Sequence, residues 1–359
     1  MKFSFTNNTG GAYSSDRIYF VIIGNNSTGQ LCHVDKDGNL IPCNESDNDA
    51  PGSLIKNQIN WCNYSHTVSE IPEIKVPKID SGRAYISLGS PVYLKILNNG
   101  YGFVGPNPAN SSDPNVDVYF DWLEFTIDDA GFHGNTTQVD QFGFPMTIEL
   151  TAPDGFPQKR GITESRSALF NDYMASVPIE FQSLAETAYR IIAPFKGDFG
   201  TGKKYETYFD SYIAEMWQYY ASSELVFSTH EGTFTGKVEN NIFAFTKDGD
   251  VNTKYTIDYP TSSQVFECAG VFAKGDATAK VIQSQLSAML NRHILRSPEN
   301  RYTPEKYYQN APANYYAEFW HRHSIDNKAY GFPFDDVCEQ STLLEEQNPE
   351  ELKVAISWD

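Results

Sequence analysis

The chain has 359 residues, a formal net charge of −19 and a pI of about 4.7. Such an acidic surface repels nucleic acids and anionic lipids, so we expect neither as a partner, whereas a neutral polymer meets no such repulsion. No apolar run approaches the roughly 18 residues of a membrane-spanning helix, so we expect no membrane segment.

Residues 1 to about 150 consist of short extended segments separated by clusters of Gly, Asn, Asp and Pro. Examples are the segments 17–24, 82–89, 91–97 and 116–127. Short strands at this spacing are typical of a β-sandwich or a β-barrel.

The segment between Cys32 and Cys43 contains an Asp-Gly pair and predicts a hairpin. The two thiols could then face each other, either as a reduced pair, which we expect, or as a disulfide. The chain has five cysteines, so at least one thiol has no partner within the chain. No CxxC spacing indicates zinc or redox chemistry.

The middle of the chain predicts a mixture of helices and hairpins. We expect a helix from Thr163 to Ser176, ended by a Val-Pro pair, and a second from Tyr205 to Tyr220, where aromatic and aliphatic residues recur every three or four positions. A third helix follows Asp276, a predicted N-cap. Between the second and third helices, residues 231–259 alternate as hairpins do.

The final residues, 350–359, predict a strand that returns to the first β-region. We therefore predict a mainly β protein with an α/β part: a β-domain of residues 1–155 and 325–359, and a mixed α/β domain of residues 156–324. His321 and His323 have no apparent third ligand, and the loop 197–204 lacks the Ser or Thr of a phosphate loop. We expect no metal site and no cofactor.

The most informative segment is 118–128, because alternation places its even-numbered residues on one face of a strand. That face carries Trp122, Glu124, Thr126 and Asp128, an aromatic beside polar groups, as an open sugar-binding surface requires. The opposite face ends in apolar residues and is predicted to face the core.

A turn follows this strand, and the chain then resumes an extended pattern. A simple hairpin centred near Phe132 would place Glu124 opposite Asp140. Ordinary solvent-exposed carboxylates are the alternative interpretation. Cleavage of a glycosidic bond requires one protonated and one ionised carboxyl group. Glu124, beside Trp122, is the candidate acid, and Asp140, among Thr and Gln, is the candidate base.

The segments DWLEFTI (121–127) and GNTTQVDQFGFPM (134–146) resemble glycoside hydrolase family 64, the laminaripentaose-producing β-1,3-glucanases. Fainter matches lie at 82–94, 262–273 and 330–337, so that the resemblance spans most of the chain. These segments look like the thaumatin-like fold of that family. The resemblance implies a β-barrel or sandwich domain and an α/β domain with a wide groove between them.

The resemblance further implies endo-acting hydrolysis of β-1,3-glucan by inversion, with Glu124 as general acid and Asp140 as general base. Laminaripentaose is then the expected product. Thr126, Asp128 and His133, with Trp122, are the expected substrate contacts. The family pattern has an amide and a large aromatic where this chain has Asp128 and His133, so the resemblance leaves those contacts open. Five cysteines cannot form the disulfide framework of plant thaumatin-like proteins.

An inverting pair needs roughly 6.5–9.5 Å between its carboxyl groups, whereas directly opposed hairpin residues have Cβ atoms only about 5 Å apart. The predicted hairpin and the implied mechanism therefore disagree. The alternative function is that of a non-catalytic thaumatin-like protein that binds β-glucan. For a polymeric substrate we expect a secreted monomer whose signal peptide is absent from this sequence, with a cytoplasmic location as the alternative.

Overall fold

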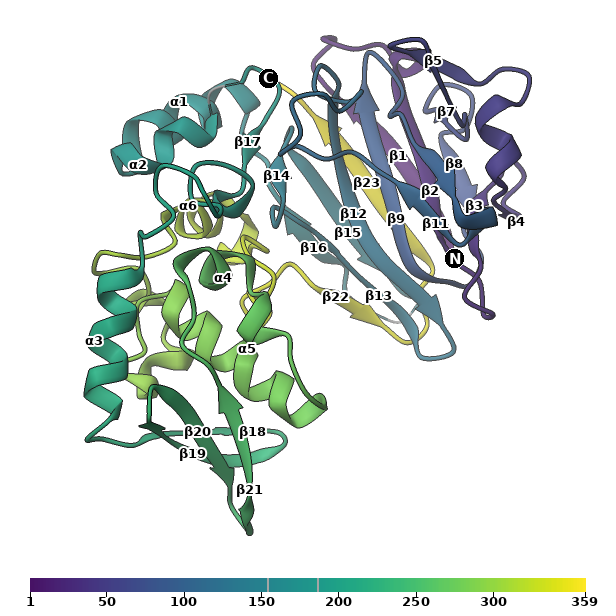
Figure 1. The fold of residues 1–359 in the computed structure, drawn as a ribbon. Helices are drawn as coiled ribbons and strands as arrows, with labels where there is room; N and C mark the ends of the chain where they lie inside the picture. Colours follow the sequence, from purple (N-terminus) through teal and green to yellow (C-terminus); the bar gives the residue numbers. More distant parts are fainter. Residues whose placement is uncertain (154, 186) are drawn as a thin grey trace.

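The computed structural model describes residues 1–153, 155–185 and 187–359. Figure 1 shows two parts: one built of long strands, which contains both chain termini, and one that contains most of the helices. Within the described residues, no helix is both long enough and apolar enough to cross a membrane. The expected mainly β architecture with an additional helical part is confirmed.

Two sheets form the β-part. The first has the strand order β16 (Gln158–Gly161), β15 (Met146–Thr151), β23 (Glu351–Ser357), β1 (Lys2–Asn8) and β8 (Glu73–Lys75). The predicted return of the last segment is confirmed, because β23 lies between β15 and β1 and runs parallel to β1.

The second sheet carries the segment that the sequence singles out. Its order is β22 (Leu344–Glu346), β13 (Gly131–Thr136), β12 (Tyr119–Asp128), β9 (Ile79–Leu88), β2 (Ile18–Asn25), β3 (Leu31–Val34) and β4 (Leu40–Pro42), with β7 (His66–Thr67) paired to β2. Two short hairpins accompany it, β5 (Leu54–Lys56) with β6 (Ile59–Trp61) and β10 (Lys95–Leu97) with β11 (Gly102–Val104).

The two sheets pack face to face as a sandwich. Phe3 of β1 and Val354 of β23 share one buried cluster with Ile22 of β2 and Leu123 and Phe125 of β12. These residues alternate along their strands, so each strand turns one face inward. The apolar face predicted for β12 is therefore correctly assigned to the core.

The opposite face of β12 differs from the prediction along half its length. Val118, Phe120 and Trp122 are buried in a further cluster, beneath residues of the segments around β10. From Glu124 onward the face opens, and Glu124 and Thr126 are partly exposed. The expected open surface thus starts two residues later than alternation alone indicates.

The hairpin of β12 and β13 turns earlier than predicted. Asp128 pairs with Gly131, so that Asp129 and Ala130 form the turn, and Glu124 lies opposite Asn135. The predicted pairing of Glu124 with Asp140 is therefore wrong. Gly131 permits the early turn because its φ is +118° and a Cβ there would lie 2.1 Å from the carbonyl oxygen of Glu346.

We expect Gly131→Ala to lower the free energy of unfolding by about 2–3 kcal/mol, through backbone strain and the clash with β22. Urea denaturation measures this. Gly29→Ala is the matched control, because Gly29 also has a positive φ, +79°, but has no atom within 4 Å of the added carbon. Equal losses in the two variants would show that the clash with β22 contributes nothing.

The second part contains a sheet and the helices. The sheet has the order β18 (Leu225–Thr229), β19 (Gly232–Glu239), β20 (Ile242–Lys247) and β21 (Asp250–Ile257). The helices are α1 (Arg166–Ser176), α2 (Ile179–Gln182), α3 (Asp210–Tyr220), α4 (Ser262–Glu267), α5 (Ala277–Asn291) and α6 (Tyr315–His323). A short ladder pairs β14 (Gln141–Phe142) with β17 (Ile191–Ile192), and so ties this part to the segment after β13.

The predicted helices are present, although two start late. The first starts at Arg166 and the second at Asp210, since the residues before each form turns or irregular chain. The third has the predicted N-cap, because the Asp276 side chain accepts from the N–H of Ala279. The predicted hairpins correspond to β19, β20 and β21.

The segment that follows α6 joins the two parts. Ala329, Phe332 and Val337 pack in the same buried cluster as the helices, whereas β22 pairs with β13 in the sandwich. The cysteines near the N-terminus lie in the sandwich part. Cys32 pairs with Pro42 across the predicted β3–β4 hairpin, and Cys32 and Cys43 are free thiols.

Candidate active site

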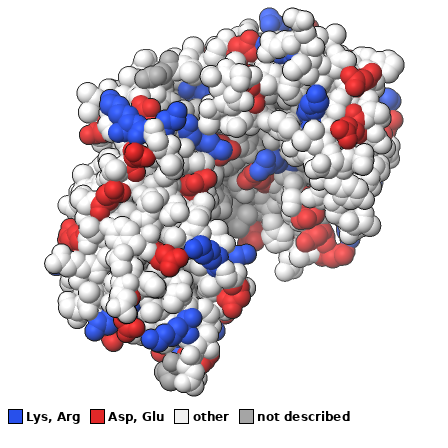
Figure 2. Space-filling view, in the orientation of Figure 1, with Lys and Arg blue, Asp and Glu red and all other residues white. Residues whose placement is uncertain are grey.

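The two candidate carboxylates line one cavity of ≈ 270 Å³. Its walls come from both parts of the molecule: Arg83, Trp122, Glu124, Asn135, Thr137, Val139, Asp140, Tyr330 and Pro333. Figure 2 shows a hollow between the two parts, with acidic and basic side chains at its edges. The side chains of Glu124 and Asp140 are 38% and 32% exposed, so both are accessible from solvent.

Glu124 lies in the middle of the second sheet. It stands between Arg83 of β9 on one side and Asn135 of β13 on the other. The Nε of Arg83 donates to Glu124 Oε1 at 3.0 Å, and an Nη of the same guanidinium donates to the hydroxyl of Tyr85 at 3.4 Å. The Arg83 guanidinium thus binds Oε1 of Glu124, the candidate acid, and this contact does not involve Oε2.

Asp140, the candidate base, lies outside the strands of the second sheet. It lies in a bend between β13 and β14, and its carbonyl oxygen accepts from the N–H of Ala193 at 2.9 Å. Lys196, in a short 3₁₀ turn from Pro194 to Lys196, lies 3.4 Å from Asp140 Oδ1. The α/β part therefore supplies the cation beside the candidate base, while the sandwich supplies the cation beside the candidate acid.

A larger cavity of ≈ 680 Å³ adjoins this one. Glu124, Arg83 and Asn135 line both cavities, and Thr126, His133, Tyr101, Phe103 and Leu343 line the larger one. The open sheet face of β9, β12 and β13 is thus continuous with the carboxylate pair. A cavity of this volume, next to the carboxylate pair, can hold a ligand of several rings.

The predicted substrate contacts divide into three groups. Thr126 and His133 lie in the larger cavity, where the Thr126 hydroxyl accepts from the N–H of Ser81 and His133 Nδ1 lies 2.8 Å from Glu345 Oε1. Trp122 lines the smaller cavity although it is almost fully buried. Asp128 lies at the end of the hairpin, where it accepts from the N–H of Ala130, and it lines neither of these cavities.

Sequence reasoning missed Arg83, Lys196, Asn135 and Tyr330. The position of Asn135 could have been predicted from the sequence, because a hairpin that turns at Asp129 places Asn135 beside Glu124. Arg83 depends on the pairing of β9 with β12, and these strands are separated by a long stretch of chain. No local pattern distinguishes Lys196 or Tyr330 from other surface residues.

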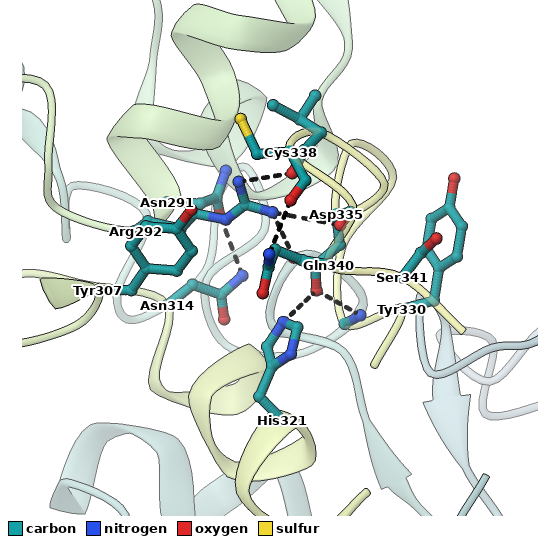
Figure 3. Close-up of polar contacts among 12 residues, drawn as sticks. Asn291, Arg292, Tyr307, Asn314, His321, Tyr330, Asp335, Cys338, Gln340 and Ser341 are labelled. Atoms are coloured by element: carbon teal, nitrogen blue, oxygen red, sulfur yellow. Dashed lines mark hydrogen bonds and ion pairs between the residues drawn. The ribbon is translucent and has the colours of Figure 1, made fainter. Parts of the chain in front are cut away.

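A buried ionic network supports the wall that Tyr330 and Pro333 form. Figure 3 shows Arg292 and His321 converging on Asp335. Arg292 donates to Asp335 Oδ1 at 2.9 Å, and His321 Nε2 lies 2.9 Å from Asp335 Oδ2. The same Oδ2 accepts from the N–H of Gly331 at 2.9 Å, next to Tyr330. Asp335 therefore fixes the turn that carries this side of the cavity.

The two histidines that the sequence raised as metal ligands bind carboxylates instead. His321 contacts Asp335, and His323 lies 2.7 Å from Glu164 and 2.9 Å from Asp172. Both histidines belong to the last turn of α6, where residues two apart do not face the same way. Each is therefore part of a different ionic contact.

Comparison with known proteins gives consistent matches. The model of a family described as β-1,3-glucanase, glycoside hydrolase family 64, matches residues 1–356. The chain is 31% identical over 289 residues to a glucan endo-1,3-β-glucosidase of Cellulosimicrobium cellulans, an alignment that covers 77% of this chain and 52% of that protein. The chain thus spans about half the length of the curated relatives it matches.

Solved structures agree in fold. A β-1,3-glucanase domain from Clostridium beijerinckii shares 40% identity and a TM-score of 0.97, with 100% of this chain and 98% of that one covered. A laminaripentaose-producing β-1,3-glucanase from Paenibacillus barengoltzii shares 37% identity and a TM-score of 0.81, covering 100% of this chain and 75% of that one. The latter enzyme has also been solved in complex with laminarihexaose.

Proposed function

Because the chain belongs to glycoside hydrolase family 64, the β-1,3-glucanases, we propose that it is an endo-acting hydrolase of β-1,3-glucan. Glu124 protonates the departing glycosidic oxygen, and Asp140 takes a proton from the attacking water. The observation that carries this proposal is that both carboxylates line one solvent-accessible cavity between the two parts of the molecule.

The charges around the cavity allow two carboxylates to line it together. Each carboxylate has its own cation, Arg83 for Glu124 and Lys196 for Asp140. Opposite charges nearby limit the repulsion that two adjacent carboxylates would otherwise exert on each other. Glu124 also borders Trp122, an apolar neighbour, in the same cavity.

Inversion at the anomeric carbon is the stereochemistry that we propose. A water molecule must fit between the base and the sugar, which requires roughly 6.5–9.5 Å between the carboxyl groups. The early turn of the β12–β13 hairpin supports this spacing, because Asp140 lies beyond the end of β13 and does not oppose Glu124. The limit of about 5 Å for directly opposed residues therefore does not apply.

Several finer features belong to the same proposal. The β-sandwich and its groove support assignment to the thaumatin-like fold. We propose a β-domain and an α/β domain near the expected boundaries, 1–155 with 325–359 and 156–324. Both boundaries fall later than expected, because β16 (Gln158–Gly161) pairs in the sandwich, and Ala329, Phe332 and Val337 pack with the helices. Thr126 and His133, lining the larger cavity, are proposed to contact the glucan, with Trp122 beside the scissile bond. Asp128 is proposed to act only at the margin of the groove. We further propose laminaripentaose as product and a secreted, monomeric enzyme.

Incubation with linear β-1,3-glucan, followed by chromatography of the products, tests the activity. We expect soluble oligosaccharides, with the five-residue product dominant. Proton NMR of the first product should show the α-anomer, because inversion of a β-linkage yields α. An initial β-anomer would contradict inversion, and glucan binding without products would instead favour a non-catalytic glucan-binding protein.

A further inference from the structure

Asp121 is a buried carboxylate on the strand that carries Glu124. Its side chain is only 3% exposed. Asp121 Oδ1 accepts from the N–H of Trp122 at 2.9 Å, and Oδ2 accepts from the N–H of Gly143 at 2.9 Å. The first contact is local to β12, but the second crosses to the segment that follows Asp140. One side chain thus links the strand of the proposed acid to the segment of the proposed base.

The two segments approach each other very closely at this point. A Cβ on Gly143 would lie 2.1 Å from the carbonyl oxygen of Phe120, so only glycine fits there. The Nε2 of Gln141 donates to the same carbonyl at 2.8 Å. Within three residues after Asp140, the chain is therefore attached twice to β12, once by Gln141 and once by Asp121.

Other hydrogen bonds connect the segment around Asp140 to the α/β part. Ala193 donates to the Asp140 carbonyl, and the hydroxyl of Tyr316 donates to the carbonyl of Gln138 at 2.6 Å. Both partners belong to the α/β part, so these bonds place Asp140 relative to the helices. The bonds from Asp121 and Gln141 place it relative to Glu124, the other member of the pair.

Burial of a carboxylate at position 121 is energetically unfavourable. Burial raises the pKa of Asp121 to about 7, although backbone N–H donors, among them Gly143, and the charge of Arg190 oppose the rise. An apolar side chain would avoid this cost, but it could not accept from two backbone N–H groups at once. The specific gain from Asp121 is the fixed separation of two backbone segments.

We infer that Asp121 is a positioning residue, which sets the distance and orientation of Asp140 relative to Glu124 through the N–H of Gly143. This inference rests on the proposed hydrolysis. Displacement of a reacting group by about 1 Å lowers rates by about 10²-fold, whereas binding of a long polymer along the groove depends little on Asp140. Asp121 should therefore influence kcat and leave KM nearly unchanged.

The test is a double-mutant cycle on laminarin hydrolysis. Asp121→Asn leaves one acceptor oxygen where two are needed, and we expect kcat to fall about 10- to 100-fold with KM within about twofold of the wild type. In an Asp140→Asn background, the same substitution should leave the residual kcat unchanged, because there is no longer a base to position. An equal fall in both backgrounds would overturn the inference, as would an unchanged kcat in Asp121→Asn.

Gln141→Met provides an independent variant, because it removes the other attachment to Phe120 and conserves volume. Gln141→Met should lower kcat when Asp140 is intact, and should leave the residual kcat of Asp140→Asn unchanged. An unchanged kcat in Gln141→Met with Asp140 intact would contradict the inference. Asp117→Asn, an exposed carboxylate paired with Lys56 just before β12, is the control expected to keep wild-type kcat. Failure of the wild-type chain itself to hydrolyse laminarin would refute the proposed function, a result distinct from all of these.

Discussion

Glu124→Gln and Asp140→Asn are each expected to lower laminarin hydrolysis by several orders of magnitude. Both substitutions conserve shape and remove the ability to exchange a proton at the reacting atoms. Glu124→Gln cannot protonate the departing oxygen, and Asp140→Asn cannot accept a proton from water. Release of reducing ends from laminarin measures both rates. Because both side chains are partly exposed, the fold should be retained, with a thermal midpoint close to that of the wild type.

Asp129→Asn is the matched control for this pair. Asp129 lies in the turn of the same hairpin, its side chain is 96% exposed and its partner is Lys78. It should retain full activity. Binding of Glu124→Gln to insoluble β-1,3-glucan should persist, since the groove is unchanged. Normal hydrolysis by either catalytic variant would refute the assignment of the pair.

Asp335→Asn is expected to cause the largest loss of stability, about 3–5 kcal/mol. Asp335 is fully buried and Arg292 is 1% exposed, so the substitution leaves a buried guanidinium without its counter-ion. The loss should also reach the active site, because Asp335 accepts from the N–H of Gly331 beside Tyr330. Urea denaturation measures the free energy of unfolding, and laminarin hydrolysis measures the second effect.

Glu215→Gln is the control for burial. Glu215 lies 3.0 Å from Arg296, nearly the same distance as in the buried pair, but both side chains are 58% exposed. Exposed pairs contribute roughly 0–1 kcal/mol, so the loss should be small. The double variant Arg292→Met with Asp335→Asn should recover part of the stability lost in Asp335→Asn. Equal losses of unfolding free energy in Asp335→Asn and Glu215→Gln would show that burial of the ion pair does not increase its contribution to stability.

The stability that Asp335 confers should depend on pH. Burial acts to raise the pKa of this carboxyl, but contacts with His321 and Arg292 outweigh it and hold the pKa below its ordinary value. A group with a lowered folded-state pKa stabilises the fold above its unfolded pKa, about 4 for Asp. That stabilisation disappears as the pH falls through the folded-state pKa. The stability curves of wild type and Asp335→Asn should therefore converge in acid.

Local patterns in the sequence predicted much of the fold. Alternation assigned Leu123 and Phe125 to the core, Asp276 marked the start of α5, and the last residues were correctly expected to form a strand of the sandwich. These features depend on residues a few positions apart. The spacing of polar and apolar side chains, and the capping preference of Asp, are sufficient to reveal them.

The candidate pair, by contrast, was identified partly by resemblance and was misplaced by local geometry. The position of a tight turn depends on which residue adopts a positive φ, and the sequence offers two glycines, Gly131 and Gly134. In the structure Gly131 adopts it, and the backbone of Glu346 lies too close to Gly131 for a Cβ. The register that places Asn135 beside Glu124 follows from this choice.

The surroundings of the pair depend on contacts between distant segments. Arg83 meets Glu124 because β9 pairs with β12, and Lys196 meets Asp140 because β17 pairs with β14. The turn beside Tyr330 is fixed by Asp335, whose position depends on its ion pair with Arg292. Such contacts leave no periodic signal, since their partners are tens of residues apart or more. The sequence therefore indicated which carboxylates to examine, and long-range packing set which charges surround them and which space they share.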